Sequence, residues 1–383
     1  MRDKKQFQYF NVLAISISHF IHDIYPSFVA PIVDELKQKL SINNAQIGFL
    51  GVMMRIPFLL NPVIGVLAER FKMRFFIIFA PALTAICMSL IGVAPSFTIL
   101  TILFFVAGIS SSLFHVPTPV MIKKVAGDKV GQGMSFYMVG GELARTIGPL
   151  IVVAAVTQWG LEGTYKVMPL GLIASAILFF RLKKIDIRKD VEAKKDFSHY
   201  KSAFKQFLPV FLVLAGITLT RGFMKSALTL YLPTFLREQG NDIWTAGVAL
   251  SVLQLSGVAG TFLSGTLSDK IGRKRMLLII AVTSPILMWL FVTYHEILAF
   301  PILIIIGFFL VAPQSVMLAV IHELDTDNLP FVNGIYMTIN FLISSLCLLA
   351  VGWVSDHIGL LLTFKITAVL AFGAIFFVLR LKK

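Results

Sequence analysis

The chain has 383 residues, of which 57% are hydrophobic and 14% charged, and its formal net charge is +14. Soluble domains carry about 45–50% apolar and about 25% charged residues. This composition therefore excludes a soluble enzyme, a secreted disulfide scaffold and a DNA-binding domain. Apolar stretches of about 20 residues, the length that crosses a bilayer, recur along the whole chain. We expect an all-α integral membrane protein embedded in a lipid bilayer.

Hydropathy and helix-breaking residues predict twelve transmembrane helices. In chain order they span residues 10–32, 44–68, 75–93, 98–121, 133–157, 165–182, 207–231, 245–267, 275–294, 298–322, 331–354 and 362–380. The first is expected to be a span rather than a cleavable signal peptide, because polar residues interrupt its apolar run and no small-residue cleavage site follows. A basic linker at 183–206 separates two predicted six-helix bundles, 1–182 and 207–383.

Lys and Arg residues are distributed unevenly between the two sides of these spans. Twenty-five lie at the termini, in the linker or in loops on the same side as these. The opposite side has five, which are Lys37, Lys39, Lys166, Arg237 and Lys365. Cytoplasmic loops of membrane proteins carry an excess of Lys and Arg. We therefore predict cytoplasmic termini and a cytoplasmic linker, and we expect no nucleic-acid partner.

Two loop segments 200 residues apart are similar to one another. GVLAERFKMR begins at Gly65 and GTLSDKIGRKR begins at Gly265, each at the end of the second span of its half. Parallel repeats of this kind relate two halves by an axis along the membrane normal. Their acidic and basic residues can form contacts that hold one conformation and break in another. The residues of this predicted conformational latch are Gly65, Glu69, Arg70, Arg74, Gly265, Asp269, Gly272, Arg273 and Lys274.

Both loop segments resemble the loop signature of the major facilitator superfamily, G-x-L-a-D-r-x-G-r-[RK]. GELARTIGP (141–149) resembles a helix 5 motif of its antiporters, and SHFIHD (18–23), SSLFH (111–115) and SFYMVGGELARTIGP (135–149) resemble the fosmidomycin-resistance-like drug exporters. The resemblance implies two six-helix pseudo-repeats in a bacterial inner membrane, a monomer, and a transporter rather than an enzyme. It also implies proton-coupled efflux, by antiport, of a small drug or metabolite.

Some residues differ from the pattern of those exporters. His22 stands where they usually have Asn, and Val116-Pro117-Thr118 replaces the Pro-Glu that usually follows the residue equivalent to His115. A helix 4 carboxylate is therefore missing. Glu142 and Arg145 add charges in helix 5, and we expect Glu142 to be able to replace the missing carboxylate.

Asp23 lies near the middle of the first predicted span, where a charge is costly and is by default a functional hypothesis. His19 is four residues away and shares its helix face. Three hypotheses follow: Asp23 exchanges a coupling proton with His19, it neutralises a buried arginine, or it binds a metal ion together with His19, His22 and His115. We favour the first, and the candidate proton-coupling residues are Asp23, His19 and Glu142.

The predicted spans contain more basic than acidic side chains, which favours an anionic cargo because guanidinium groups bind carboxylates and phosphates at two points. The alternative is that these bases are paired internally or reach the membrane surface. The candidate substrate-binding residues are Arg221, Arg55, Arg145, Lys225, His22, His115, Gln254, Gln314 and Asn340.

The sequence does not distinguish export from import. An uptake or exchange permease for a small organic anion is therefore an alternative, as is a metal-ion transporter that uses His19, His22 and Asp23. We expect no cofactor, and no ATP-driven transport within this chain, because it has no G-x-x-x-x-G-K-[ST] loop. Cys87 and Cys347 lie in apolar runs, and we expect them to be packing residues.

Overall fold

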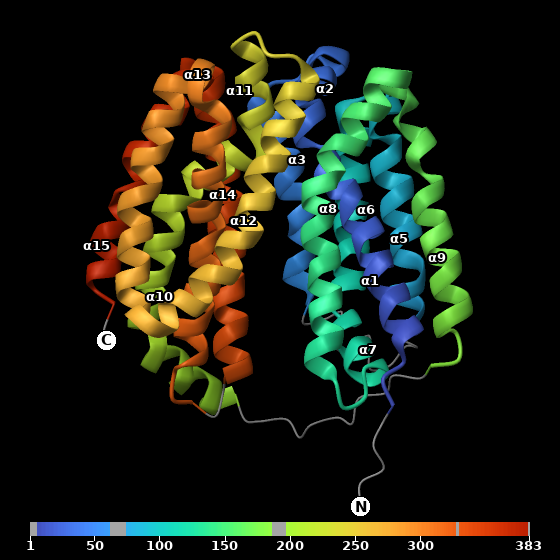
Figure 1. The fold of residues 1–383 in the computed structure, drawn as a ribbon, viewed down its shortest axis with the longest axis horizontal. Coiled ribbons are helices and arrows are strands. Elements are labelled where there is room, and N and C mark those ends of the chain that lie inside the picture. The colour runs from blue at the N-terminus through green and yellow to red at the C-terminus, as the bar shows by residue number, and fades with distance from the viewer. Residues whose placement is uncertain (1–5, 62–73, 186–196, 327–328, 382–383) are drawn as a thin grey trace, which may run out of the picture. The chain divides into compact units, whose positions relative to one another are not determined.

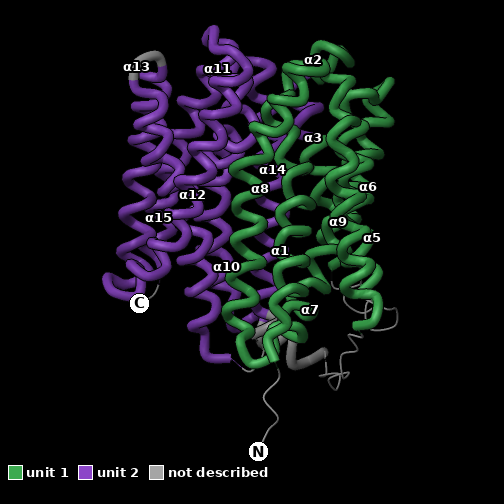
Figure 2. The backbone as a smooth tube through the Cα atoms, turned by 45° about the vertical axis from the view of Figure 1, so that its right-hand side comes forward, with its two compact units in different colours: residues 1–42, 50–192 green, residues 43–49, 193–383 purple. Residues whose placement is uncertain are grey.

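The computed structural model describes residues 6–61, 74–185, 197–326 and 329–381, and all regular structure in these ranges is helical (Figure 1). This confirms the prediction of an all-α protein. The chain divides into two compact units, residues 1–42 with 50–192 and residues 43–49 with 193–383 (Figure 2). Residues 43–49 thus belong to the second unit, although they lie in the first half of the sequence.

The first unit contains the helices that carry most of the candidate residues of the N-terminal half. They are α1 (Tyr9–Ile24), α2 (Val33–Leu40), α5 (Arg74–Ser89), α6 (Phe97–His115), α7 (Thr118–Val125), α8 (Val130–Trp159) and α9 (Pro169–Leu182), with the short turns η1 (Tyr25–Phe28), η2 (Ala30–Ile32), η3 (Ile56–Leu60), η4 (Leu90–Val93) and η5 (Glu162–Val167). Within this unit α1 packs on α8 and α9, and α5 packs on α6 and α9.

The second unit contains longer helices. They are α10 (Phe197–Ser226), η6 (Ala227–Tyr231, a π-helical turn), α11 (Leu232–Glu238), α12 (Ile243–Ile271), α13 (Arg273–His322), α14 (Leu329–Ala371) and α15 (Gly373–Leu379). α13 is kinked at Tyr294 and Leu298, and α14 is broken at Gly359. Gly359 has φ +77°, a left-handed conformation that glycine adopts without steric cost. The principal packed pairs are α12 with α13 and α10 with α14.

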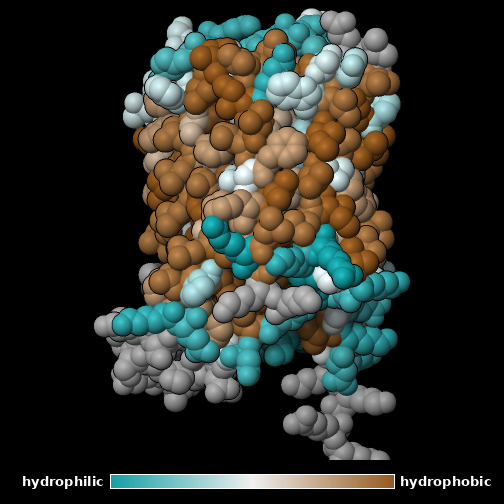
Figure 3. Space-filling model, turned by 90° about the vertical axis from the view of Figure 1, so that its left-hand side faces the viewer, coloured by the Kyte–Doolittle hydropathy of each residue, from teal (hydrophilic) through white to brown (hydrophobic). Residues whose placement is uncertain are grey.

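Among the described residues, 10 helices are long and apolar enough to cross a membrane. The last of them, Val332–Leu379, includes two of the predicted spans, and the predicted span 44–68 begins in a shorter apolar helix, Asn44–Leu60, and continues outside the described residues. The face in Figure 3 is mainly hydrophobic over its middle and hydrophilic towards its ends. A multi-pass membrane protein is confirmed, while the number of twelve spans and the cytoplasmic termini stay predictions.

Helix α1 ends close to its ionisable residues because proline interrupts it. Pro26 has no N–H for the carbonyl of residue 22, and the chain continues from Ile24 as the 3₁₀ turns η1 and η2. At its other end, the N–H of Gln8 donates to the carbonyl of Val125 at 2.9 Å and fixes the start of α1 against α7. His19, His22 and Asp23 therefore lie in the last two turns of an anchored helix.

Helix α3 (Asn44–Arg55) begins in the second unit, where Asp356 of α14 caps it. The two carboxylate oxygens accept the N–H groups of Asn44 at 2.8 Å and Ala45 at 2.7 Å. The hydroxyl of Tyr231 donates to the carbonyl of Asn44 at 2.9 Å. Unpaired N–H groups at a helix start favour a negative side chain, so these contacts hold residues 43–49 on the second unit.

Candidate functional site

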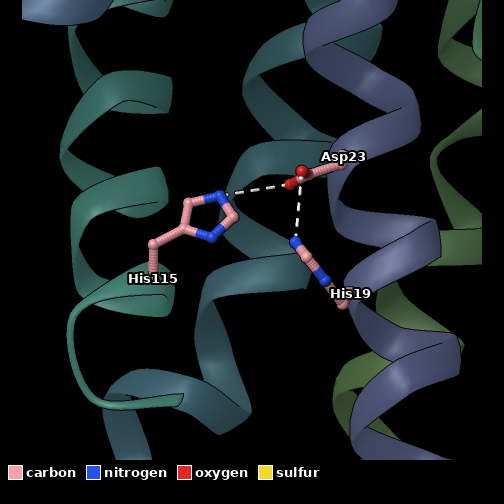
Figure 4. Close-up of side chains that lie close together, drawn as sticks. All are labelled: His19, Asp23 and His115. Atoms are coloured by element: carbon pink, nitrogen blue, oxygen red, sulfur yellow. Dashed lines mark ion pairs between the residues drawn. The ribbon is translucent and has the colours of Figure 1, made fainter. Parts of the chain in front are cut away.

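Three histidines surround the carboxylate of Asp23 in the first unit. His19 Nε2 lies 3.2 Å from Oδ2, while His22 Nδ1 at 2.8 Å and His115 Nε2 at 3.2 Å both face Oδ1. His19 and Asp23 are one turn apart on α1, and His115 points toward the carboxylate from the end of α6 (Figure 4). All three ring-to-carboxylate contacts are within direct hydrogen-bonding or ion-pairing distance.

Two aromatic side chains fix the ring planes of His22 and His19. The ring of His22 stacks on Phe114 with centroids 4.5 Å apart and an interplanar angle of 10°. The ring of His19 stacks on Tyr137 at 3.9 Å and 13°. With the ring planes fixed, each histidine presents one nitrogen to Asp23 and the other nitrogen away from it.

Glycines of α8 allow the close approach that this stacking needs. A Cβ on Gly141 would lie 2.6 Å from Cε1 and 2.9 Å from Nε2 of His19, and a Cβ on Gly140 would meet the carbonyl of Ser16. The side chain of any other residue would therefore displace α1 or the His19 ring.

The outer nitrogens of the three imidazoles also have partners. His19 Nδ1 lies 2.7 Å from the carbonyl oxygen of Tyr137, and His115 Nδ1 lies 3.1 Å from the hydroxyl of the same tyrosine. His22 Nε2 lies 3.0 Å from the hydroxyl of Thr84. Because every ring nitrogen in the cluster has a polar partner, the protonation of each ring is tied to its neighbours.

Exposure within the cluster increases in one direction. The exposed fraction of the side chain is 0% for His22, 12% for Asp23 and 34% for His115. Asp23 is therefore nearly enclosed, and solvent reaches the cluster most easily at His115.

The cluster also has the spacing of a metal site. His19 Nε2, His115 Nε2 and an oxygen of Asp23 all lie within 4.8 Å of one another. His22 is outside that group, and its 2.8 Å contact with Asp23 has the length of a direct hydrogen bond. The proton and metal hypotheses both stay predictions: three side chains have metal-ligand spacing, and His22 is a fourth group in direct contact with Asp23.

The other charged candidates of the first unit are not part of this cluster. Arg145 pairs with Glu142 one turn earlier on α8, with Nη1 3.0 and 3.1 Å from the two carboxylate oxygens. Glu142 thus neutralises Arg145, and it makes no contact with Asp23 among the described residues. Arg55, at the end of α3, has no hydrogen bond or ion pair within the described part of the chain.

Arg221 is buried in the second unit without an acidic partner among the described residues. Its Nη2 donates to the carbonyls of Phe309 at 3.1 Å and Leu310 at 3.3 Å in α13. Pro313 has no N–H for the carbonyl of Phe309, four residues earlier, so Arg221 supplies the missing donor. Within the described residues, the buried Nε of Arg221 has no hydrogen-bond partner, and no carboxylate neutralises the positive charge of the guanidinium.

The remaining polar candidates of the second unit are dispersed. Asn340 accepts a hydrogen bond from Thr218 at 2.8 Å, which joins α14 to α10. Gln254 is partly buried on α12, and Gln314 and Lys225 are exposed on α13 and α10. These residues do not form a second ionisable cluster in the described ranges.

Most of the first copy of the predicted latch lies outside the described residues, whereas the second copy is described in full. Gly65, Glu69 and Arg70 lie outside the described residues. Arg74 Nη1 donates to the carbonyl of Ile185 at 3.3 Å.

In the second copy, Arg273 is the centre of the contacts. Its guanidinium pairs with Asp269 at 2.5 Å and Glu323 at 2.7 Å, and it also donates to Ser268 and to the carbonyl of Gly265. Gly272 has φ +94° at the turn into α13, and Lys274 Nζ donates to the carbonyls of Leu379 and Leu381. Glu323, at the C-terminal end of α13, is also part of this network.

Several contacts of the Asp23 cluster are absent from the sequence prediction. Tyr137, Thr84 and Ser110 are ordinary residues in apolar spans, and nothing in their spacing indicates a shared site. Tyr137 falls within a segment used for the family resemblance, which is the one signal that indicates it. Asp356, the α3 cap, has no local signal because its partner is 312 residues away.

A family model described as Major Facilitator Superfamily matches residues 15–346. The chain belongs to this superfamily. The fosmidomycin resistance protein of Escherichia coli (strain K12) is 24% identical over 369 residues, which cover 93% of this chain and 89% of that protein. The uncharacterized MFS-type transporter YfnC of Bacillus subtilis (strain 168) is also 24% identical, with 91% of this chain and 87% of that protein covered. Both resemblances stated from the sequence are confirmed.

Solved structures of the superfamily share the fold. A bacterial homolog of the human lysosomal transporter Spinster superposes with a TM-score of 0.81 at 18% identity and covers 99% of this chain and 98% of its own. The nucleoside transporter NupG gives 0.77 at 13% identity, with 96% and 98% covered. The chain is thus a membrane transporter for small molecules rather than an enzyme, and a multi-pass protein of a bacterial inner membrane.

Proposed function

We propose that this major facilitator protein exports a small, anionic drug or metabolite in exchange for protons, by alternating access. The observation that carries the proposal is the enclosed Asp23 carboxylate with three imidazoles in contact. An ionisable side chain at membrane depth costs free energy, so such residues are usually paired with another group or take part in function. Imidazole is the side chain whose ordinary pKa lies near neutral pH, which makes a carboxylate in contact with three imidazoles a candidate proton-binding site.

The anionic character of the cargo is supported by Arg221. A buried guanidinium with an unpartnered Nε offers a charge and a donor to a carboxylate or phosphonate. Arg55, also without a described partner, is a second candidate contact, whereas Arg145 is already paired with Glu142. The names of two relatives, a fosmidomycin resistance protein and multidrug resistance protein MdtG of Serratia proteamaculans, support export of a drug.

The proposal includes the topology inferred from the sequence. It assigns two six-helix halves at 1–182 and 207–383, a cytoplasmic linker between them, cytoplasmic termini and a monomeric state. The loop residues around Arg273 serve as a latch between conformations rather than as a binding site, because their partners are other loop and helix-end residues.

The test is flux of radiolabelled fosmidomycin, a phosphonate, into liposomes of phosphatidylethanolamine and phosphatidylglycerol that contain the purified protein. An antiporter accumulates the compound when the lumen is acidic, and a symporter when the outside is acidic. We expect accumulation with an acidic lumen, and we expect Asp23→Asn to abolish it while exchange of labelled for unlabelled compound continues. Glu142→Gln makes the same carboxylate-to-amide change in the Glu142–Arg145 ion pair, and this variant should still accumulate the compound when the lumen is acidic.

Other outcomes would replace the proposal. Accumulation driven by an acidic exterior would indicate an uptake permease. Exchange in the wild type with no accumulation under either pH gradient would indicate an exchanger. Loss of coupling in Glu142→Gln rather than in Asp23→Asn would move the proton site to Glu142. Transport of Zn²⁺ or another divalent metal, lost on substitution of His19 or His115, would favour the metal-ion transporter.

A further inference from the structure

The hydrogen bonds around His19 determine which of its nitrogens carries a proton when the ring is neutral. His19 Nδ1 faces the carbonyl oxygen of Tyr137 at 2.7 Å. A carbonyl only accepts hydrogen bonds, so Nδ1 carries the hydrogen. In the neutral ring Nε2 then has a lone pair, and this lone pair faces Oδ2 of Asp23 at 3.2 Å. The contact becomes attractive only when a further proton lies between these two atoms.

A chain of hydroxyls imposes the same condition on His22. Ser110 donates to the carbonyl of Ala80 at 2.8 Å, and Thr84 donates to Ser110 at 2.8 Å. Each hydroxyl has one hydrogen, so Thr84 has none left for His22 and can only accept from its Nε2, at 3.0 Å. The neutral ring therefore carries its hydrogen on Nε2, and the lone pair of Nδ1 faces Oδ1 of Asp23 at 2.8 Å.

His115 differs from the other two histidines. Its Nδ1 faces the phenol of Tyr137 at 3.1 Å, and a phenol can donate as well as accept. With Tyr137 donating, a neutral His115 carries its hydrogen on Nε2 and gives it to Asp23. The three contacts with Asp23 therefore need two protons beyond those of three neutral imidazoles and one carboxylate.

We propose that the cluster is a two-proton site, with one proton between His19 Nε2 and Asp23 and the other between His22 Nδ1 and Asp23. This deepens the proposed coupling function and rests on it. Binding of both protons changes the charge of the cluster from −1 to +1. Thr84 and Ser110 are positioning residues, because they hold His22 in the tautomer that makes its contact with Asp23 depend on a proton.

No other ionisable group among the described residues contacts the cluster and would change the number of protons that it binds. The titratable groups that face Asp23 are His19 and His22 of α1, His115 of α6 and Tyr137 of α8, while α5 contributes the neutral hydroxyl of Thr84. Glu142 and Arg145 of α8 form an ion pair with each other. Helices α7 and α9, which also pack on α1, place no charged side chain in contact with the cluster within the described residues.

The test is ¹⁵N NMR of histidine-labelled, full-length protein in detergent micelles between about pH 4.5 and 9, because imidazole nitrogens report tautomer and charge directly. His22→Gln assigns the signals of His22. In the wild type we expect neutral His22 with its hydrogen on Nε2, and imidazolium at low pH. In Thr84→Val the acceptor is lost, so the neutral ring moves its hydrogen to Nδ1 and donates to Asp23. The pH of half-protonation of His22 then falls by about one unit or more, a tenfold loss of proton affinity.

Ser110→Ala tests the series of hydroxyl hydrogen bonds without changing a residue that contacts Asp23 or a histidine. Thr84 is then free to donate to Nε2 of His22, and the same tautomer change follows. Thr84→Ser keeps the hydroxyl and should restore the wild-type spectrum. Ser112→Ala removes the hydroxyl of another buried serine of α6, for which the described part of the chain offers no hydrogen-bond partner, and should leave His22 unchanged. Total proton uptake between these pH values, measured with a pH indicator, should be one proton per chain lower in Thr84→Val than in the wild type.

A hydrogen on Nδ1 of neutral His22 in the wild type, or an unchanged His22 spectrum in both Thr84→Val and Ser110→Ala, overturns the two-proton site. So does one divalent metal ion per purified chain bound to the His19 and His115 nitrogens. These results are independent of flux. Normal coupling in Asp23→Asn with the expected tautomers would instead overturn the proposed function.

Discussion

Gly141 determines how closely α8 approaches the ionisable side chains of α1. The same face of α8 presents Tyr137, whose ring, hydroxyl and carbonyl all contact the histidines. The geometry of the cluster therefore depends on the small residues of α8 at this contact, Gly140 and Gly141.

We predict that Gly141→Ala displaces His19 and uncouples transport. The added Cβ would lie 2.6 Å from the His19 ring, and overpacking of this kind costs about 1–3 kcal/mol. Thermal unfolding in detergent and gradient-driven flux measure the two effects. Gly131→Ala is the matched control on α8, because its Cβ would meet nothing within 4 Å. Equal behaviour of the two variants would show that the close approach is unimportant.

The partnership of His19 with Asp23 could be predicted from sequence, because a four-residue spacing on a helix is a local property. His115 was named with Asp23 only in the metal hypothesis, and the contacts with Thr84 and Tyr137 could not be predicted, since they depend on how α5 and α8 are rotated about their axes. That rotation is set by packing, and one residue of rotation would turn these side chains away. The position of Asp23 and its candidate imidazole partners were thus predictable, whereas the hydrogen bonds that hold the outer nitrogens of these rings were not.

At the scale of helices, a proline leaves a backbone carbonyl without its usual donor, and a buried side chain of a neighbouring helix replaces that donor. Pro313 frees the carbonyl of Phe309, and Arg221 of α10 satisfies it across the helix pair. The sequence predicted that Arg221 lies within a membrane span. It did not indicate that one nitrogen of its guanidinium donates to backbone carbonyls of α13.

We predict a favourable coupling between Arg221 and Pro313 in a double-mutant cycle. Arg221→Met should destabilise the protein by about 1–3 kcal/mol, because a buried carbonyl loses its donor. In a Pro313→Ala background the helix supplies its own N–H to Phe309, so the same change should cost less. Thermal unfolding measures this difference. Pro285→Ala, at another proline of α13, should give additive effects with Arg221→Met, and a similar result with Pro313→Ala would refute the coupling.

At the scale of the whole molecule, the distribution of Lys and Arg sets the expected orientation. The hydropathy pattern predicted helices throughout, and the described ranges are helical. It could not predict that residues 43–49 would belong to the second unit, because hydropathy assigns a segment to the membrane but not to a partner.

We predict that Lys37→Cys is labelled by a membrane-impermeant maleimide in intact cells, whereas Lys195→Cys in the linker is labelled only after permeabilisation. Background labelling is low because the two native cysteines are buried. The reverse pattern would invert the proposed topology. Labelling of both positions in intact cells would contradict a single orientation.

The capping of α3 by Asp356 also bears on biosynthesis. Residues 43–49 leave the ribosome early, but the carboxylate that accepts the N–H groups of Asn44 and Ala45 belongs to α14, near the C-terminal end. The first half of the chain therefore cannot finish folding while translation proceeds. Its second membrane segment waits for its partner until synthesis is almost complete, and the two halves reach their final structure together rather than one after the other.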